Sequence, residues 1–190
     1  ICIDIICHGV PTPKLFSKYV SELEEKYNDK LLDYNFRDKE TGWDNYSNTM
    51  MFKNKKVSEL KIDNDYMKLF LSNYPLRESC YQCNFKLGNK YSDITLGDFW
   101  GIKKVNPKMY DENGVSAIII NTKKGKVLFQ KIKKDLIYEK CTIENIISGN
   151  IFLVNSCKKS AKRELFFNEL DSHTTEELLK KYIPKQLRIT

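Results

Sequence analysis

Two cysteines separated by two residues lead into a strand-like stretch, and this combination constrains the chain more than any other feature. Cys80 and Cys83 form a Cys-x-x-Cys pair within residues 77–101. A turn can point both sulfurs at one ion, whereas a disulfide across so short a loop is strained. A tetrahedral zinc ion or an iron–sulfur cluster normally takes four protein ligands, so the pair predicts half of a metal site. Buried or incidental cysteines are the alternative.

Residues 92–99 follow the cysteines and alternate polar and apolar side chains with the period of a strand. Asp98 interrupts the apolar face and is followed by Phe99, Trp100 and Gly101. An acid beside large flat rings, with a glycine that lets backbone approach a ligand closely, suits a planar cofactor. The alternative is a turn in which Asp98 caps free backbone amides and Trp100 fills the core.

Hydrophobic periodicity and capping residues predict an α/β fold, with a mixed α+β arrangement as the alternative. We expect a central, partly parallel sheet flanked by helices, a β–α–β unit over residues 115–141, a loop over residues 103–113 and a helical C-terminal tail. With 190 residues and 41% hydrophobic content, residues 1–190 are expected to form a single domain. The expected strands are residues 1–7, 31–39, 45–52, 57–61, 92–99, 115–121 and 136–141, and the expected helices are residues 13–27, 66–74, 125–134, 142–149, 160–170 and 174–182.

The apolar run of residues 1–7 lacks an initiating Met, so we expect the chain to begin in mid-protein. Such a run suits a strand that is covered on both faces. Ligands gather at the carboxyl ends of strands in open α/β sheets, which makes Cys7 a candidate third metal ligand. His8 is a second candidate, with a role in the turn as its alternative. Cys141 and Cys157 have no ligand-spaced neighbour, so we expect both to be structural.

Two cations at the end of the second expected strand supply a candidate anion site. Arg37 and Lys39 share a face of residues 31–39 and lie close in sequence to Trp43. Together they can grip a pyrophosphate or a carboxylate, and surface ion pairing is the alternative.

The net charge of +7 comes mainly from lysines, because the chain has only four arginines. Surfaces that read nucleic-acid sequence depend on arginine forks and interleaved aromatic rings, so we expect no nucleic-acid partner. The sequence has neither an apolar run of about eighteen residues nor a secretion leader, which predicts a cytoplasmic protein without a membrane span. Six unevenly spaced cysteines favour thiols and metal over a disulfide framework.

Four blocks carry a resemblance to a known family. They are residues 6–13 (ICHGVPTP), residues 35–39 with Gly42 and Trp43, residues 77–86 (RESCYQCNFK) and residues 92–101 (SDITLGDFWG). In this order they resemble the C-terminal part of the coenzyme F-420 hydrogenase/dehydrogenase beta-subunit family, and a weaker match continues through residues 163–167. Members of that family are iron–sulfur flavoproteins, or relatives of them, that pass electrons between a cluster, a flavin and a partner.

The resemblance implies roles for particular residues. Cys7, Cys80 and Cys83 match the family's ligands of a 4Fe–4S cluster, and the remaining ligand belongs to a Gly-Thr-Pro-Cys-Gln segment that the family carries upstream. It further implies a ferredoxin-like electron-transfer domain in the same chain, or a deazaflavin-type coenzyme, as electron partner. Together with the residue patterns above, it leads us to expect a pocket for a flavin such as FAD, or for a substrate, lined by Arg37, Lys39, Asp98 and Trp100.

A second function class stays open beside this one. In it the chain is a non-catalytic binding module whose Cys-x-x-Cys pair holds a structural zinc ion or no metal. Such a module would meet a protein partner or serve polysaccharide biosynthesis, because many bacterial relatives of the family sit among cell-surface polysaccharide genes.

Overall fold

The computed structural model describes residues 1–88 and 91–184 and has the expected α/β class, with helices at its C-terminal end. The chain divides into two compact units. Unit 1 contains Ile1–His8 and Gln82–Cys157, and unit 2 contains Gly9–Tyr81 and Lys158–Thr190. The expectation that residues 1–190 form one domain stays a prediction. No helix in the described part of the chain has the length and apolar character that a membrane crossing needs.

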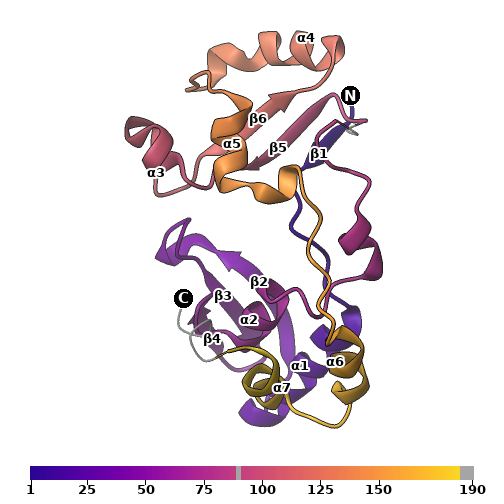
Figure 1. Ribbon diagram of the computed structural model, residues 1–190. Coiled ribbons are helices and arrows are strands. Elements are labelled where there is room, and N and C mark those ends of the chain that lie inside the picture. The colour runs from indigo at the N-terminus through magenta and orange to yellow at the C-terminus, as the bar shows by residue number, and fades with distance from the viewer. Residues whose placement is uncertain (89–90, 185–190) are drawn as a thin grey trace. The chain divides into compact units, whose positions relative to one another are not determined.

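Unit 1 is built on a three-stranded sheet in the order β1–β5–β6 (Figure 1). Strand β1 (Ile3–Ile5) runs parallel to β5 (Ile94–Asp98), and β6 (Ser116–Ile120) runs antiparallel to β5. The sheet is therefore partly parallel, as the sequence predicts. Because β5 lies between the other two strands, its residues Ile94 and Thr95 are buried.

Three helices complete unit 1: α3 (Ile102–Val105), α4 (Lys123–Ile132) and α5 (Ile143–Gly149). Side-chain caps fix the starts of the two longer ones, since Thr122 accepts from the Gly125 amide and Thr142 forms a capping box with Asn145. A Cβ on Gly125 would overlap the Asp93 carbonyl oxygen, so α4 can approach the start of β5 this closely only with glycine there.

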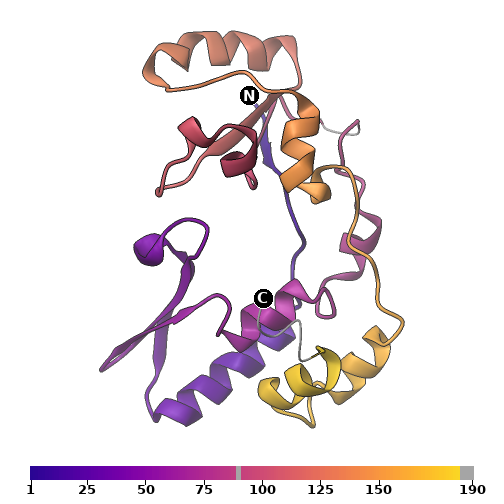
Figure 2. The same cartoon turned by 60° about the vertical axis from the view of Figure 1, so that its left-hand side comes forward.

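Unit 2 contains an antiparallel sheet of β2 (Leu31–Asp38), β3 (Ser47–Phe52) and β4 (Lys56–Leu60), with β3 in the centre. Helix α1 (Pro13–Tyr27) runs beside β2, and α2 (Asp65–Leu71) follows the sheet (Figure 2). Aromatic rings join these elements. Phe16 of α1 lies 5.5 Å from Tyr34 of β2 and 5.3 Å from Tyr66 of α2 between ring centroids. The aromatic stripe of α1 is therefore core, as its helical spacing predicts.

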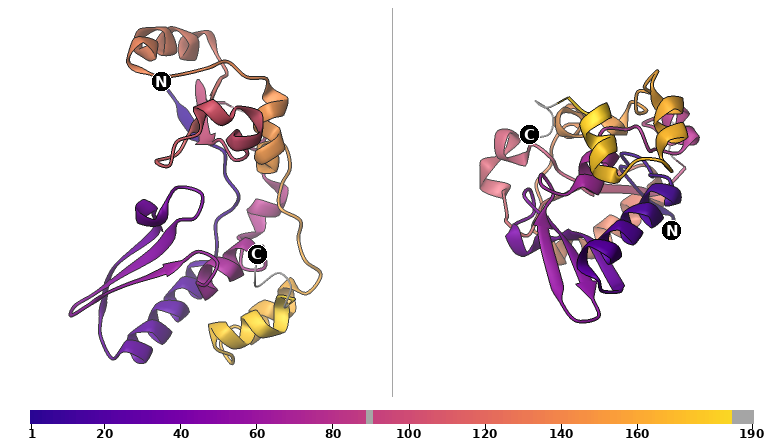
Figure 3. Two further views of the ribbon diagram at one scale, coloured as in Figure 1. Left: turned by 90° about the vertical axis from the view of Figure 1, so that its left-hand side faces the viewer. Right: turned by 90° about the horizontal axis from the view of Figure 1, so that it is seen from below.

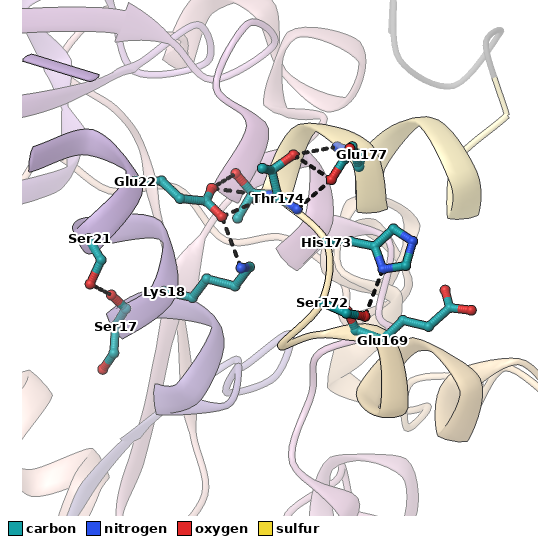
Figure 4. Close-up of polar contacts among 10 residues, drawn as sticks. Ser17, Lys18, Ser21, Glu22, Glu169, Ser172, His173, Thr174 and Glu177 are labelled. Carbon is teal, nitrogen blue, oxygen red and sulfur yellow. Dashed lines mark hydrogen bonds and ion pairs between the residues drawn. The ribbon is translucent and has the colours of Figure 1, made fainter. Parts of the chain in front are cut away.

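Helices α6 (Arg163–Glu169) and α7 (Thr175–Tyr182) complete unit 2. The capping box predicted from Thr174 and Glu177 is present at the start of α7. Glu22 of α1 accepts hydrogen bonds from the Thr175 backbone amide and hydroxyl, which places α7 beside α1 (Figures 3 and 4).

Four expectations about elements are wrong. Residues 136–141 form no strand, because no neighbouring strand pairs with them; Ile137 is 94% exposed. The β–α–β unit over residues 115–141 is therefore absent, and β6 pairs antiparallel with β5 instead. Residues 103–113 are not a plain loop, since they contain most of α3 and a 3-10 helix at Pro107–Met109. Strand β1 is not covered on both faces: it lies at the sheet edge, with Ile3 and Ile5 52% and 63% exposed.

Candidate functional site

The Cys-x-x-Cys pair lies on a short 3-10 helix and the residue after it. Cys80 sits within the helix Glu78–Gln82, Cys83 follows directly, and the Cys80 amide donates to the Arg77 carbonyl at 2.9 Å. Both cysteines are half-buried, and all six cysteines of the chain are thiols rather than disulfide halves. Cys80 belongs to unit 2 whereas Cys83 belongs to unit 1, and a metal shared by the two sulfurs stays a prediction.

Cys80 packs against the segment that precedes α1. The backbone amide of Val10 donates to the Cys80 sulfur at 3.3 Å, and the Arg77 amide donates to the Val10 carbonyl at 2.9 Å. Thr12 also donates its amide to the Pro75 carbonyl, at 2.7 Å. A Cβ on Gly9 would come within 2.8 Å of the Leu76 side chain, so glycine permits this close approach. An amide that donates to sulfur stabilises the thiolate, which is the form that binds metal.

Cys7 and His8 follow β1 in unit 1, as the sequence predicts for the end of that strand. Cys7 is exposed, and the His8 ring lies edge-on against Phe152 with 4.3 Å between centroids. Buried Cys157 donates its thiol to the His8 carbonyl at 2.9 Å, which is the structural role expected of it. Cys141 is exposed, so the expectation of a structural role for it is wrong.

Asp98 and Trp100 lie together in unit 1, at the end of β5. The Trp100 amide donates to the Asp98 carbonyl at 3.0 Å, and Asn150 donates its side-chain amide to the same carbonyl at 3.0 Å. A Cβ on Gly149 would overlap the Trp100 carbonyl oxygen, so the end of α5 packs directly on this turn. The turn is thus held from α5, and both side chains are half-buried.

Arg37 and Lys39 belong to unit 2 and differ in their surroundings. The Arg37 guanidinium lies 4.9 Å from the centre of the Tyr46 ring, a cation–π contact, and Lys61 stacks on the same ring at 5.0 Å. Burial, partly opposed by Asp44, lowers the pKa of Lys61 from its ordinary value. Lys39 is exposed in the 3-10 helix Lys39–Thr41, beyond the end of β2. Trp43, 2% exposed, is core rather than an accessible ring.

Comparison with known proteins identifies the family of the chain. A family model for the C terminus of the beta subunit of coenzyme F420 hydrogenase/dehydrogenase matches residues 1–146. The chain belongs to this family. No curated protein and no solved structure gave a significant match. The matched range includes all seven candidate site residues and ends before α6 and α7.

The donor chemistry of Cys7, Cys80 and Cys83 fits an iron–sulfur cluster, because all are thiols and one sulfur already accepts a backbone amide. Within residues 1–88 and 91–184, however, no group of three or more His, Cys, Asp or Glu side chains is placed to hold a metal ion. The three residues therefore suit a cluster by their chemistry, while the structure supplies no coordination geometry.

Sequence reasoning missed the residues that hold the cysteine loop. Arg163 of α6 donates to the Leu76 carbonyl at 2.8 Å and to the Tyr81 hydroxyl at 3.2 Å, and its guanidinium is 3.1 Å from the Glu78 carboxylate. Lys159 donates to Glu78 at 2.5 Å and holds the pKa of that carboxyl below its ordinary value. The resemblance over residues 163–167 marked Arg163 without indicating what it contacts.

Proposed function

We propose that the chain is the C-terminal part of an oxidoreductase subunit that passes electrons between an iron–sulfur cluster, a flavin and a partner. The observation that carries this proposal is the family match over residues 1–146, which takes in both cysteine motifs and the turn at the end of β5. Proteins of this kind leave the redox chemistry to their cofactors and supply binding, orientation and electrostatics.

Cys7, Cys80 and Cys83 would hold the cluster, a 4Fe–4S cluster by family, with the fourth ligand supplied from outside these three. The cluster, when bound, supplies one-electron transfer. The contribution of this chain is to keep the thiols deprotonated and placed. The Val10 amide that donates to the Cys80 sulfur supports that role, because it stabilises the thiolate. Hydrogen bonds to cluster sulfurs also raise the reduction potential.

We propose that Asp98 and Trp100 contact a flavin such as FAD, or the substrate. The same role is proposed for Arg37 and Lys39. The turn that carries Asp98 and Trp100 has its backbone fixed by Asn150 and Gly149, which suits a site that must not rearrange. The cationic pair suits phosphate or carboxylate groups.

The partner is proposed to be a ferredoxin-like domain or protein, and the location to be the cytoplasm. A net charge of +7 favours encounter with an acidic electron carrier. Six thiols without a disulfide suit a reducing compartment.

Iron and sulfide analysis of the anaerobically purified protein, at its full natural length, tests the cluster. Cys80→Ser and Cys83→Ser are each expected to lower iron, sulfide and visible absorbance together by at least about half, because a thiolate cluster needs its complete ligand set. Cys141→Ser is the matched control, since Cys141 is exposed and has no ligand-spaced neighbour. Unchanged iron in both ligand variants contradicts the proposal, and zinc without sulfide favours the binding-module alternative.

The same preparations test the flavin contact. Asp98→Asn keeps the shape of the side chain and removes its charge, so it is expected to weaken FAD binding roughly tenfold with little change in melting temperature. Asp111→Asn, in an exposed turn, is the control. A large fall in melting temperature with unchanged FAD affinity would show that Asp98 is structural.

A further inference from the structure

Arg163 is largely buried, and the contacts of its side chain that the structure describes go to one loop or to its own helix. Its side chain is 16% exposed and meets a carbonyl, a hydroxyl and a carboxylate, from Leu76, Tyr81 and Glu78. The guanidinium also lies 4.3 Å from the centre of the Phe167 ring. Every one of these residues belongs to unit 2. A planar fork of five donors can serve three such partners at once, whereas a lysine ammonium cannot match that geometry.

The residues that Arg163 holds stand on both sides of Cys80. Glu78 lies two residues before the cysteine, and Tyr81 follows it directly. Tyr81 in turn donates its hydroxyl to the Asn73 carbonyl, which ties the loop back to the end of α2. Lys159 holds Glu78 from a second direction. The loop is therefore fixed from the α6 region through side chains.

The backbone of the same loop is fixed by residues 10–12. Pro11 forms a bridge with Leu76, and Arg77 donates its amide to Val10, whose own amide donates to the Cys80 sulfur. Loss of the Arg163 contacts would leave the loop held by this pairing, by the Tyr81–Asn73 hydrogen bond and by Lys159, so the sulfur and the Val10 amide would separate more often.

We propose that Arg163 is the positioning residue for Cys80: it holds the loop 76–81 so that the Cys80 sulfur stays on the Val10 amide, ready to bind metal. The inference rests on the proposed function for its consequence in the loaded protein. It concerns a residue that lies outside the range matched by the family model. Arg163 touches no reacting group in this proposal and acts through the cysteine.

Arg163→Gln, Arg163→Lys and two controls test the proposal in the anaerobically purified, full-length protein. Arg77→Gln removes the same charge from an exposed position of the same loop. Glu22→Ala destabilises unit 2 at the α1–α7 contact, away from the loop. Where Arg163→Gln fails to fold, Tyr81→Phe takes its place, because it removes the hydroxyl that accepts from Arg163 and donates to the Asn73 carbonyl.

Two readouts separate positioning from stability. In Arg163→Gln, amide hydrogen exchange in residues 9–12 and 75–81 is expected to rise roughly tenfold more than at the other buried amides of unit 2. This local rise is expected to be smaller in Arg163→Lys and absent in Arg77→Gln, whereas Glu22→Ala is expected to speed exchange no more in these residues than elsewhere in unit 2. In the iron-loaded protein, Arg163→Gln is expected to lower iron content at least about twofold and to alter the electron paramagnetic resonance spectrum of the reduced cluster. Arg163→Lys is expected to restore part of both, and the two controls are expected to retain the wild-type spectrum.

The outcomes distinguish failure of the inference from failure of the proposed function. A wild-type protein without iron and sulfide contradicts the proposed function, and hydrogen exchange then decides the positioning role alone. A loaded Arg163→Gln with the wild-type spectrum and iron content overturns the positioning role and leaves the proposed function standing. An equal rise of exchange in Arg163→Gln and Glu22→Ala, for residues 75–81 relative to the other buried amides of unit 2, also overturns it.

Discussion

Tyr66 shows how the burial of one side chain links the stability of unit 2 to pH. The residue is 4% exposed, and burial raises the pKa of its hydroxyl from 10.0 to about 12. Because the folded state keeps this proton longer than the unfolded chain does, the ionisation of Tyr66 makes stability no more dependent on pH below about pH 10. As pH rises from 10 towards 12, the unfolded state gains by ionising, and the free energy of unfolding falls by about 1.4 kcal/mol per pH unit for this proton.

Tyr66→Phe is expected to remove that part of the alkaline loss, because phenylalanine has no proton to release. The variant and the wild type should have similar slopes of stability against pH near neutrality and diverge between about pH 10 and 12, with the variant losing less. Urea unfolding at a series of pH values measures this. Tyr91→Phe is the control, since Tyr91 is 84% exposed. Parallel curves for wild type and Tyr66→Phe would contradict the prediction.

Single residues of the candidate site differ in how far the sequence predicts them. Spacing alone singles out Cys80 and Cys83, because two ligands of one metal can lie close in sequence, and their shared metal stays a prediction. The contact from Val10 to Cys80 spans seventy residues, and no periodicity or spacing signals it. Arg163 is still further in sequence from the loop that it holds. The sequence is equally consistent with Arg163 as a solvated surface cation. Long-range polar contacts depend on the packed backbone, so only the structure identifies them.

At the scale of elements, capping chemistry and ring packing explain what the sequence predicts well. Thr12 and Pro13 mark the start of α1, and Thr174 and Glu177 mark the start of α7, because these signals act within a few residues. Residues 136–141 carry a strand-like pattern as well. A strand needs a neighbour for its backbone groups, and no other strand of the described chain pairs with them, so the local pattern is not realised.

The contact between α1 and α7 depends on one carboxylate. Glu22 accepts from the Thr175 amide at 3.1 Å and from its hydroxyl at 2.5 Å, and it also forms an ion pair with Lys18 at 3.1 Å (Figure 4). Thr175 is 4% exposed, so water cannot readily replace the lost acceptor. Glu22→Ala is therefore expected to lower the free energy of unfolding by about 2 kcal/mol, because it leaves buried donors unsatisfied.

Urea unfolding measures this effect. Glu25→Ala serves as the matched control, because Glu25 is an exposed glutamate on the same helix. The control should change stability by no more than about 0.5 kcal/mol. Equal effects of the two substitutions would show that Glu22 acts only through helix propensity or general charge.

At the scale of the whole molecule, each unit has its own buried residues. In unit 1 they include Ile94, Phe99 and Leu153, and in unit 2 they include Leu15 and Phe166. Residues in separate cores can open separately, whereas a single domain of this size normally unfolds as one cooperative unit. The sequence predicts one domain from length and composition alone, and neither property distinguishes one core from two.

Hydrogen exchange on a pair of destabilised variants decides between these cases. Gly149→Ala places a Cβ against the Trp100 carbonyl in unit 1, and Glu22→Ala removes the α1–α7 contact in unit 2. If the cores are independent, Gly149→Ala is expected to speed exchange at the buried amides of unit 1 by roughly tenfold or more and to leave those of unit 2 unchanged, with the reverse for Glu22→Ala. Uniform acceleration across both units in either variant would contradict independence and establish residues 1–190 as one cooperative domain.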